Sequence, residues 1–271
     1  MTATARGDLL SRLKKFVRSL PFHSKQKICV CLAISTVLTG SIYAGHARSG
    51  TTPSAAIAAE RPAPAPQPIP ASLVTDKGKF RIMAGGEQVG REEFEISQDG
   101  ANWVARGTSE VKSAEGTVHV TGTLELQSDG SPLHYEWSTQ GPKKASATIT
   151  FSGPSATIEL RMEGARPYAQ QFTFNSPQVV ILDNNLYHQY AILARLYDWN
   201  KKGAQTFSVL VPQELTPGSV TVESLGQQTV EGKKLDELSV KTEDLELDLY
   251  LDGPRLMRIA SPTGNAEIVR E

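Results

Sequence analysis

The stretch Leu245-Glu246-Leu247-Asp248-Leu249-Tyr250-Leu251-Asp252 decides the fold class of this chain. Its leucines occupy every second position, and charged or hydroxyl-bearing side chains occupy the positions between them. Successive side chains of a β-strand point to opposite faces of a sheet, so this alternation predicts a strand with one apolar and one polar face. Such a division is typical of antiparallel sheets that pack one face on a core.

The same alternation recurs from Gly78 to Glu271. In 147–151 and 156–160, for example, apolar residues alternate on both sides of Ser152-Gly153-Pro154, which predicts a β-hairpin. Short connections between successive runs favour a meander, in which strands that are neighbours in sequence pair with each other. We therefore predict an all-β domain, an antiparallel meander sheet curled into a half-barrel around a single amphipathic helix.

The helix is predicted at 184–199, where the apolar residues are spaced by four, three and four: Leu186, Tyr190, Leu193 and Tyr197. Either Asp183 or Asn184 can cap its amino end, and Gly203 suits the turn after its carboxyl end. A helix of about 15 residues is roughly 23 Å long. It is too short to cover the inner faces of ten or more strands.

Two arrangements resolve this mismatch. In one, the sheet closes on itself and side chains fill its interior. In the other, it leaves an apolar groove that holds a lipid or another apolar ligand, because large uncovered apolar faces are unusual in soluble monomers. The aromatic and aliphatic side chains near the helix are the candidate lining of that groove: Phe172, Phe174, Leu186, Tyr190 and Phe207.

The amino-terminal third is predicted to lie outside this domain. Residues 1–47 combine a basic segment with the uncharged run 28–44, which indicates a signal peptide or a signal anchor. Cleavage after Ala44 or Ala47 and retention as a transmembrane anchor both fit its length. Residues 48–77 are rich in Pro and Ala and predict a disordered linker, so the domain is expected to span 78–271, and residues before Lys77 are expected to add nothing to its stability.

Composition narrows the classes of partner. Arg48 and the residues after it contain 21 basic and 28 acidic residues, a net charge of −7, which argues against a nucleic-acid partner. Both cysteines, Cys29 and Cys31, lie in the apolar run, so the exported part has no thiol for a disulfide or a zinc site. We expect no cofactor and no metal. His134 and Glu136 share a strand face, and we interpret them as solvated side chains.

Three segments together resemble a known kind of protein: FRIMAGGEQVGREEFEI at 80–96, VVILDNNLYHQYAILARLYDW at 179–199 and LELDLYLDGPRLMRI at 245–259. They are similar to uncharacterised bacterial exported families with a curved meander sheet around a helix, a group loosely similar to the periplasmic carriers of lipoproteins. The resemblance implies the half-barrel fold and carries no catalytic residue. The predicted leader in residues 1–47 is part of the same resemblance, and it predicts export, to the periplasm or the periplasmic side of the inner membrane.

Three functions remain open at this stage. The first is a non-enzymatic envelope protein that binds or carries a lipid, an acylated protein or another apolar ligand, with membrane contact through 28–44 if that run is not cleaved. The second is a periplasmic scaffold or adaptor that binds another envelope protein and has a packed interior without a ligand. The third is a hydrolase that uses His188, although the chain has no Gly-x-Ser-x-Gly, His-Glu-x-x-His or Walker motif.

Overall fold

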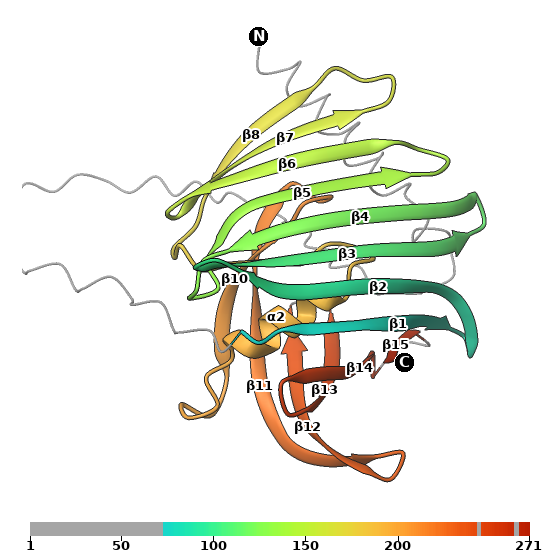
Figure 1. The fold of residues 1–271 in the computed structure, drawn as a ribbon, viewed down its shortest axis with the longest axis vertical. Coiled ribbons are helices and arrows are strands. Elements are labelled where there is room, and N and C mark those ends of the chain that lie inside the picture. The colour runs from blue at the N-terminus through green and yellow to red at the C-terminus, as the bar shows by residue number, and fades with distance from the viewer. Residues whose placement is uncertain (1–72, 243–244, 263–265) are drawn as a thin grey trace, which may run out of the picture.

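The computed structural model describes residues 73–242, 245–262 and 266–271. These residues form fifteen strands and one helix (Figure 1). In chain order the elements are β1 (Asp76–Ala84), β2 (Glu87–Asp99), β3 (Asn102–Ser113), β4 (Gly116–Leu126), β5 (Pro132–Gln140), β6 (Ala145–Ser152), β7 (Ser155–Met162), β8 (Tyr168–Thr173), β9 (Val179–Ile181), α2 (His188–Leu196), β10 (Gln205–Val211), β11 (Thr216–Val230), β12 (Lys233–Lys241), β13 (Glu246–Asp252), β14 (Arg255–Ala260) and β15 (Ala266–Arg270).

All these strands belong to one sheet in the order β8-β7-β6-β5-β4-β3-β2-β1-β15-β14-β13-β12-β11-β10-β9. Each pair is antiparallel except β9 with β10, which run parallel. The pairing of β1 with β15, where Phe80 lies opposite Arg270, joins the amino-terminal half of the sheet to the carboxyl-terminal half. The predicted all-β meander is therefore confirmed, with one parallel pair that the alternation did not indicate.

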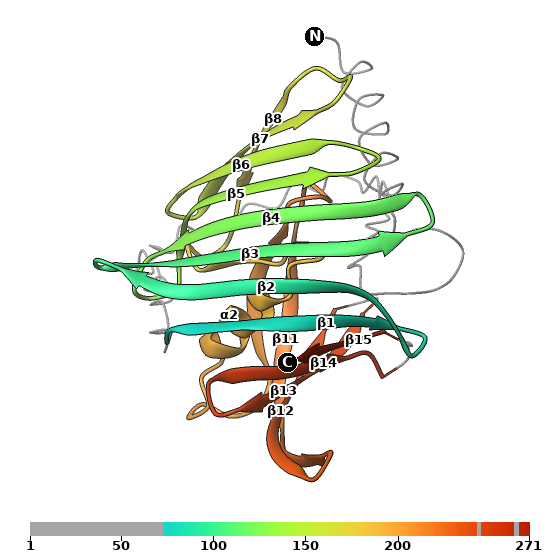
Figure 2. The same cartoon turned by 45° about the vertical axis from the view of Figure 1, so that its right-hand side comes forward.

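The sheet curls without closing and encloses the helix. In two views α2 lies between the strands β1–β4 and the strands β10–β12, and β9 comes close to β5 (Figures 1 and 2). Strands β6–β8 continue past the region occupied by the helix. The predicted half-barrel around a single helix is confirmed for the part of the chain that the structure describes.

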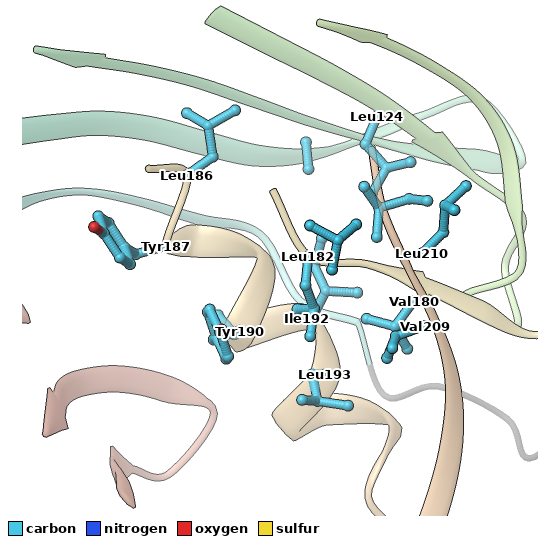
Figure 3. Packing of buried hydrophobic residues seen from close by; sticks show 14 of the residues in the cluster. Leu124, Val180, Leu182, Leu186, Tyr187, Tyr190, Ile192, Leu193, Val209 and Leu210 are labelled. Carbon is cyan, nitrogen blue, oxygen red and sulfur yellow. The ribbon is translucent and has the colours of Figure 1, made fainter. Parts of the chain in front are cut away.

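One hydrophobic cluster lies inside the curl of the sheet. It contains inward side chains of both halves of the sheet together with those of α2, and all nine residues of α2 are buried. Figure 3 shows Leu182, Ile192, Leu193 and Val209 gathered between the helix and the neighbouring strands. Each such aliphatic side chain contributes roughly 1.5–3 kcal/mol when fully buried. The helix is thus a core helix, whereas its sequence pattern predicted an amphipathic one with an exposed face.

The helix is also shorter than predicted, because the residues before it take other roles. It begins at His188, and Tyr187 is its N-cap residue without a side-chain cap hydrogen bond. Asn185 has a φ of 79°, a left-handed conformation that interrupts a helix. Asp183, one of the two predicted caps, accepts hydrogen bonds from Tyr135 and Gln213 instead. Its carboxylate is therefore occupied away from the helix.

The folded part begins earlier than the predicted boundary at Gly78. Strand β1 starts at Asp76, whose exposed fraction is 4%, and Leu73 is buried in the hydrophobic cluster. Asp76 binds Arg195 of α2 at 3.0 Å and Arg270 of β15 at 2.7 Å. The expectation that residues before Lys77 add nothing to stability stays a prediction, and these contacts of Asp76 argue against it for 73–76. The predicted signal segment 1–47 and most of the predicted linker 48–77 lie outside the described residues.

Candidate functional site

A row of glycines creates the space for the helix on the inner face of the sheet. The cross-strand register aligns Gly78, Phe94, Gly107, Gly122 and Trp137 on β1 to β5. A Cβ atom added at Gly107 would collide with the ring of His188, and one added at Gly122 would lie 2.5 Å from Leu186 Cδ1. Glycine inside a strand commonly marks such a close approach. Leu186, just before α2, and His188, its first residue, therefore pack directly against the sheet at these glycines.

A buried carboxylate of β2 caps the amino end of the helix. Glu92 Oε2 accepts a hydrogen bond from the backbone N–H of Tyr187 at 2.8 Å, and Glu92 Oε1 accepts one from the backbone N–H of His188 at 3.4 Å. Oε1 also lies 2.5 Å from His188 Nδ1. Glu92 is 0% exposed and His188 is 1% exposed. The two carboxyl oxygens thereby satisfy N–H groups that have no partner within the helix.

The geometry defines how the His188 ring is used. Because Glu92 accepts the two backbone N–H groups, the ring bond is best described as Nδ1–H donating to the carboxylate. The ring stacks on Phe94 at 5.7 Å between centroids and with an interplanar angle of 8°. His188 Nε2 is buried and has no hydrogen-bond partner in the described part of the chain. A carboxylate therefore orients the imidazole, as in a hydrolase, but none of the described residues offers a hydroxyl group that hydrogen-bonds Nε2.

A second buried centre is built around Asp183, just after β9. Tyr135 of β5 donates to Asp183 Oδ2 at 2.5 Å, and Gln213 donates to Oδ1 at 2.6 Å. Gln189 of α2 accepts from the backbone N–H of Asp183 at 2.5 Å and donates to Tyr135 OH at 3.3 Å. These bonds tie the segment before the helix to β5, to the helix itself and to the turn after β10.

Burial dominates the acid–base properties of this centre. It raises the pKa of Asp183 to about 8, although the hydrogen bonds from Tyr135 and Gln213 act in the opposite direction and the charge of Glu92 adds to the rise. Burial likewise raises the pKa of the Tyr135 hydroxyl, helped by the neighbouring Asp183. A carboxyl group with this pKa is largely protonated at neutral pH. Asp183 is therefore an uncharged hydrogen-bonding group of the interior, whereas Glu92 serves as the acceptor for the N–H groups at the start of the helix.

A third polar cluster fastens the carboxyl end of the helix. Arg195 donates to Asp76 Oδ2, to the carbonyl of Pro254 and to the carbonyl of Val74. Arg270 makes a second pair with Asp76 and lies 5.3 Å from the ring of Phe94. Burial lowers the pKa of Arg195, and the charge of Asp76 opposes that shift. The cluster connects the start of the domain, the helix and the last strand.

The five predicted ligand-binding residues all lie in the hydrophobic cluster. Their exposed fractions range from 0% at Leu186 to 8% at Phe174, and they come from β8 and its end, from the segment before α2, from α2 and from β10: Phe172, Phe174, Leu186, Tyr190 and Phe207. Leu186 and Tyr190 are packed around the helix (Figure 3). Side chains this buried present almost no surface to a ligand in this conformation. Their role in ligand binding stays a prediction.

Other predicted positions are on the surface. His134 and Glu136 lie 3.3 Å apart with side chains 30% and 67% exposed, consistent with a solvated strand face.

A surface hollow lies at the end of the β2–β3 pair, lined by Gln88, Val89, Gly90, Arg91, Glu110 and Lys112. Within the described ranges, no group of three His, Cys, Asp or Glu residues is arranged to hold a metal ion.

The sequence reasoning singled out His188 and missed the residues that surround it. Glu92 lies 96 positions away and sits in an alternating strand whose other acids are exposed. The alternation of β2 could have predicted its position. Glu92 lies two and four residues before Phe94 and Ile96, so its side chain is on the same inward face of the strand. Gly107 and Gly122 offered a similar signal, since each interrupts a run of inward-facing residues.

Comparison of the chain with family models, curated proteins and solved structures found no match. The resemblance to bacterial exported half-barrel families therefore stays a prediction. No helix in the described part of the chain is long and apolar enough to cross a membrane, and the apolar run 28–44 lies outside that part.

Proposed function

We propose that the protein is a non-enzymatic scaffold or adaptor of the bacterial cell envelope, which binds another protein through its outer surface and holds no ligand inside. The observation that carries this proposal is the packing of the interior. The helix and all five residues expected to line a groove are buried against other side chains. A filled interior leaves the outer face and the ends of the sheet as the surfaces available for binding.

The outer face supports this proposal because it is polar and ordered by ion pairs. Lys79 contacts Glu93 at 2.6 Å, and Arg91 contacts Glu110 at 3.6 Å. Solvent screens exposed pairs of this kind, so they add little to stability and their charges remain accessible to a partner. The location in the envelope rests on the composition of residues 1–47.

A hydrolase is not favoured by the site. The imidazole of His188 is oriented by Glu92, but both side chains are sealed from solvent. Ser109 lies opposite Glu92 in the β2–β3 register, and its Oγ is buried without a hydrogen-bond partner in the described part of the chain. A catalytic centre needs a path for substrate to the nucleophile. The dyad is better explained as the structural cap of α2.

A carrier of an amphipathic ligand is the second candidate, favoured by one observation. Three polar atoms on the inner faces of β3 and β5 are buried without partners in the described residues: Ser109 Oγ, Trp137 Nε1 and Thr139 Oγ1. Unpaired buried polar groups cost roughly 1–3 kcal/mol each. A ligand with a polar head group could satisfy them if this part of the sheet opened.

Native mass spectrometry of the full chain, purified from its own envelope in mild detergent, separates these functions. The adaptor proposal predicts a complex with a second, different protein in a simple ratio and no lipid that stays bound at one molecule per chain. A stoichiometric lipid would overturn the proposal in favour of the carrier, and Trp137→Phe should then reduce its occupancy. A chain that carries neither a protein nor a lipid would also contradict the adaptor.

A further inference from the structure

Two large apolar side chains are exposed among the residues that the structure describes, and the fold brings them close together. Trp199 is 43% exposed in the loop 198–204 after α2, and Leu225 is 49% exposed in β11. Tyr197 connects them. Its ring packs against the Trp199 ring in a T-shaped arrangement at 5.2 Å between centroids, and its hydroxyl accepts a hydrogen bond from the backbone N–H of Ser224 at 3.2 Å.

Hydrogen bonds hold the loop that carries Trp199 in one conformation. The buried side chain of Gln205 accepts from the backbone N–H of Asp198 at 2.9 Å and donates to the carbonyl of the same residue at 2.8 Å. The Tyr197 hydroxyl donates to the carbonyl of Gly203 at 2.9 Å. An exposed side chain on such a preorganised loop loses little conformational entropy when it meets a partner.

The charge beside this apolar pair is positive, although the chain from Arg48 onward is acidic overall. Lys201 and Lys202 are exposed, and neither forms an ion pair with a residue that the structure describes. The nearest acids are engaged: the carboxylate of Asp198 accepts a hydrogen bond within the loop, and Glu223 lies diagonally opposite a lysine of β12. The rest of β11 after Glu223 has no charged residue.

The chain enters the folded domain at the same end. The carbonyl of Val74 accepts a hydrogen bond from Arg195 at 3.0 Å, and Arg195 lies in the last turn of α2, just before the loop. In two views the start of β1 and the loop after α2 lie at one end of the molecule (Figures 1 and 2). A bilayer that held the predicted signal segment 28–44 would therefore be connected to the domain at the end that carries Trp199.

We propose that Trp199, Lys201, Lys202 and Leu225 form a membrane patch that rests on a phospholipid bilayer containing anionic lipids. Tryptophan favours the membrane–water interface because its ring is apolar and carries one polar N–H, and each lysine near an anionic surface strengthens binding several-fold. A protein partner is less favoured, because tryptophans that dominate protein interfaces lie in packed pockets, whereas the five residues after Trp199 are all exposed.

The contact orients the domain on the membrane and does not depend on the adaptor function. Quenching by lipids with brominated acyl chains tests it, because bromine quenches a tryptophan that reaches the bilayer. The chain has three tryptophans and none lies before Trp103, so the segment 28–44 gives no signal of its own. With the full chain in vesicles of phosphatidylcholine and phosphatidylglycerol, we expect quenching that persists in Trp103→Phe and disappears in Trp199→Phe.

A pair of double variants tests the role of the lysines. Lys201→Gln with Lys202→Gln should lower the quenched fraction at least about twofold, because the attraction to phosphatidylglycerol is lost. Lys143→Gln with Lys144→Gln removes the same charge from the β5–β6 connection, on the opposite side of the molecule in both views, and should leave the quenching unchanged. Equal losses in the two double variants would show that only the total charge of the domain matters and would overturn the patch.

The remaining outcomes separate this proposal from the adaptor function. No quenching in the parent chain, or quenching that survives in Trp199→Phe, would overturn the membrane contact. If the parent were unquenched and Trp199→Ala lost its second protein in native mass spectrometry, the patch would belong to the protein partner instead. Quenching at Trp199 in a chain that carries no second protein would support the membrane contact and contradict the adaptor alone.

Discussion

At the scale of single residues, the charged side chains inside the sheet are held by the helix that they help to position. Glu92 satisfies two backbone N–H groups at the start of α2 and pairs with His188, so neither member is left alone. Removing one member of a buried pair usually costs more than the pair itself contributes, because the other is left without its partner.

Glu92→Gln should therefore destabilise the fold strongly. The amide keeps the size of the side chain, but its NH2 group cannot accept a hydrogen bond, so at least one N–H group at the start of the helix or on the His188 ring loses its buried acceptor, and we expect the free energy of unfolding to fall by about 1–3 kcal/mol. Urea unfolding followed by circular dichroism measures it. Glu93→Gln is the matched control, since Glu93 is exposed and solvent screens its ion pair with Lys79, so this variant should lose far less stability. Equal losses in the two variants would show that Glu92 is not a cap.

Asp183 gives the unfolding free energy a pH dependence of defined sign. Its pKa in the folded protein is about 8, above its ordinary value of 3.8, so folding takes up a proton between these values. Its stabilising contribution is complete below about pH 4 and is lost as the pH rises through 8. Relative to Asp183→Asn, the parent should lose up to about 1.4 kcal/mol per pH unit over that window. Urea unfolding at a series of pH values measures this difference. If the free energy of unfolding changed equally with pH in the two proteins from pH 5 to pH 8, the raised pKa of Asp183 would be contradicted.

At the scale of elements, the position of α2 depends on the absence of side chains at two glycines of the sheet, Gly107 and Gly122. Gly107 lies beneath the His188 ring, and a methyl group there has no room, because the nearest ring atoms belong to a side chain that Glu92 holds in place. The helix therefore approaches the sheet more closely at this row than strands with side chains would permit.

Gly107→Ala should raise the helix from the sheet and lower the free energy of unfolding by about 1–3 kcal/mol, the usual cost of overpacking. Thr108→Ala, on the exposed face of the same strand, should change it by less than about 0.5 kcal/mol. Thermal unfolding of the two variants and the parent measures these differences in stability. If Gly107→Ala were as stable as the parent, the close contact with His188 would not exist in solution.

At the scale of the whole molecule, Asp76 holds three distant parts of the chain together. Asp76 is the first residue of β1, and its carboxylate forms ion pairs with Arg195 in α2 and with Arg270 in β15, the last strand. The two halves of the sheet meet at the same place, through β1 and β15. The loss of this carboxylate leaves two guanidinium groups facing each other in a buried cluster.

Asp76→Asn should therefore lower the free energy of unfolding by about 3 kcal/mol and increase the exposure of α2, because the penalty of an unpaired buried charge falls on Arg195. Hydrogen exchange of the α2 amides together with urea unfolding measures both effects. Asp99→Asn, an exposed carboxylate at the end of β2, serves as the control. A fully stable Asp76→Asn would restore the view that residues before Lys77 are only a linker.

The sequence by itself determined the class of fold, the meander and the existence of one helix. These properties follow from side-chain periods of two and of about 3.6 along the chain, which depend on near neighbours alone. It located the helix but misjudged its first residue and its environment, because Asp183 and all sides of α2 find partners from other elements.

Only the tertiary structure decided what surrounds the helix. Glu92 and His188 are 96 residues apart, and Tyr135 and Asp183 are 48 apart. Their contacts depend on the register of several strand pairs and on how far the sheet curls. No local pattern carries that information, since one acid in an alternating strand looks like any other until the partner strand defines its face. For the same reason the sequence could propose a groove beside the helix, but only the packed interior showed that its candidate residues are already covered.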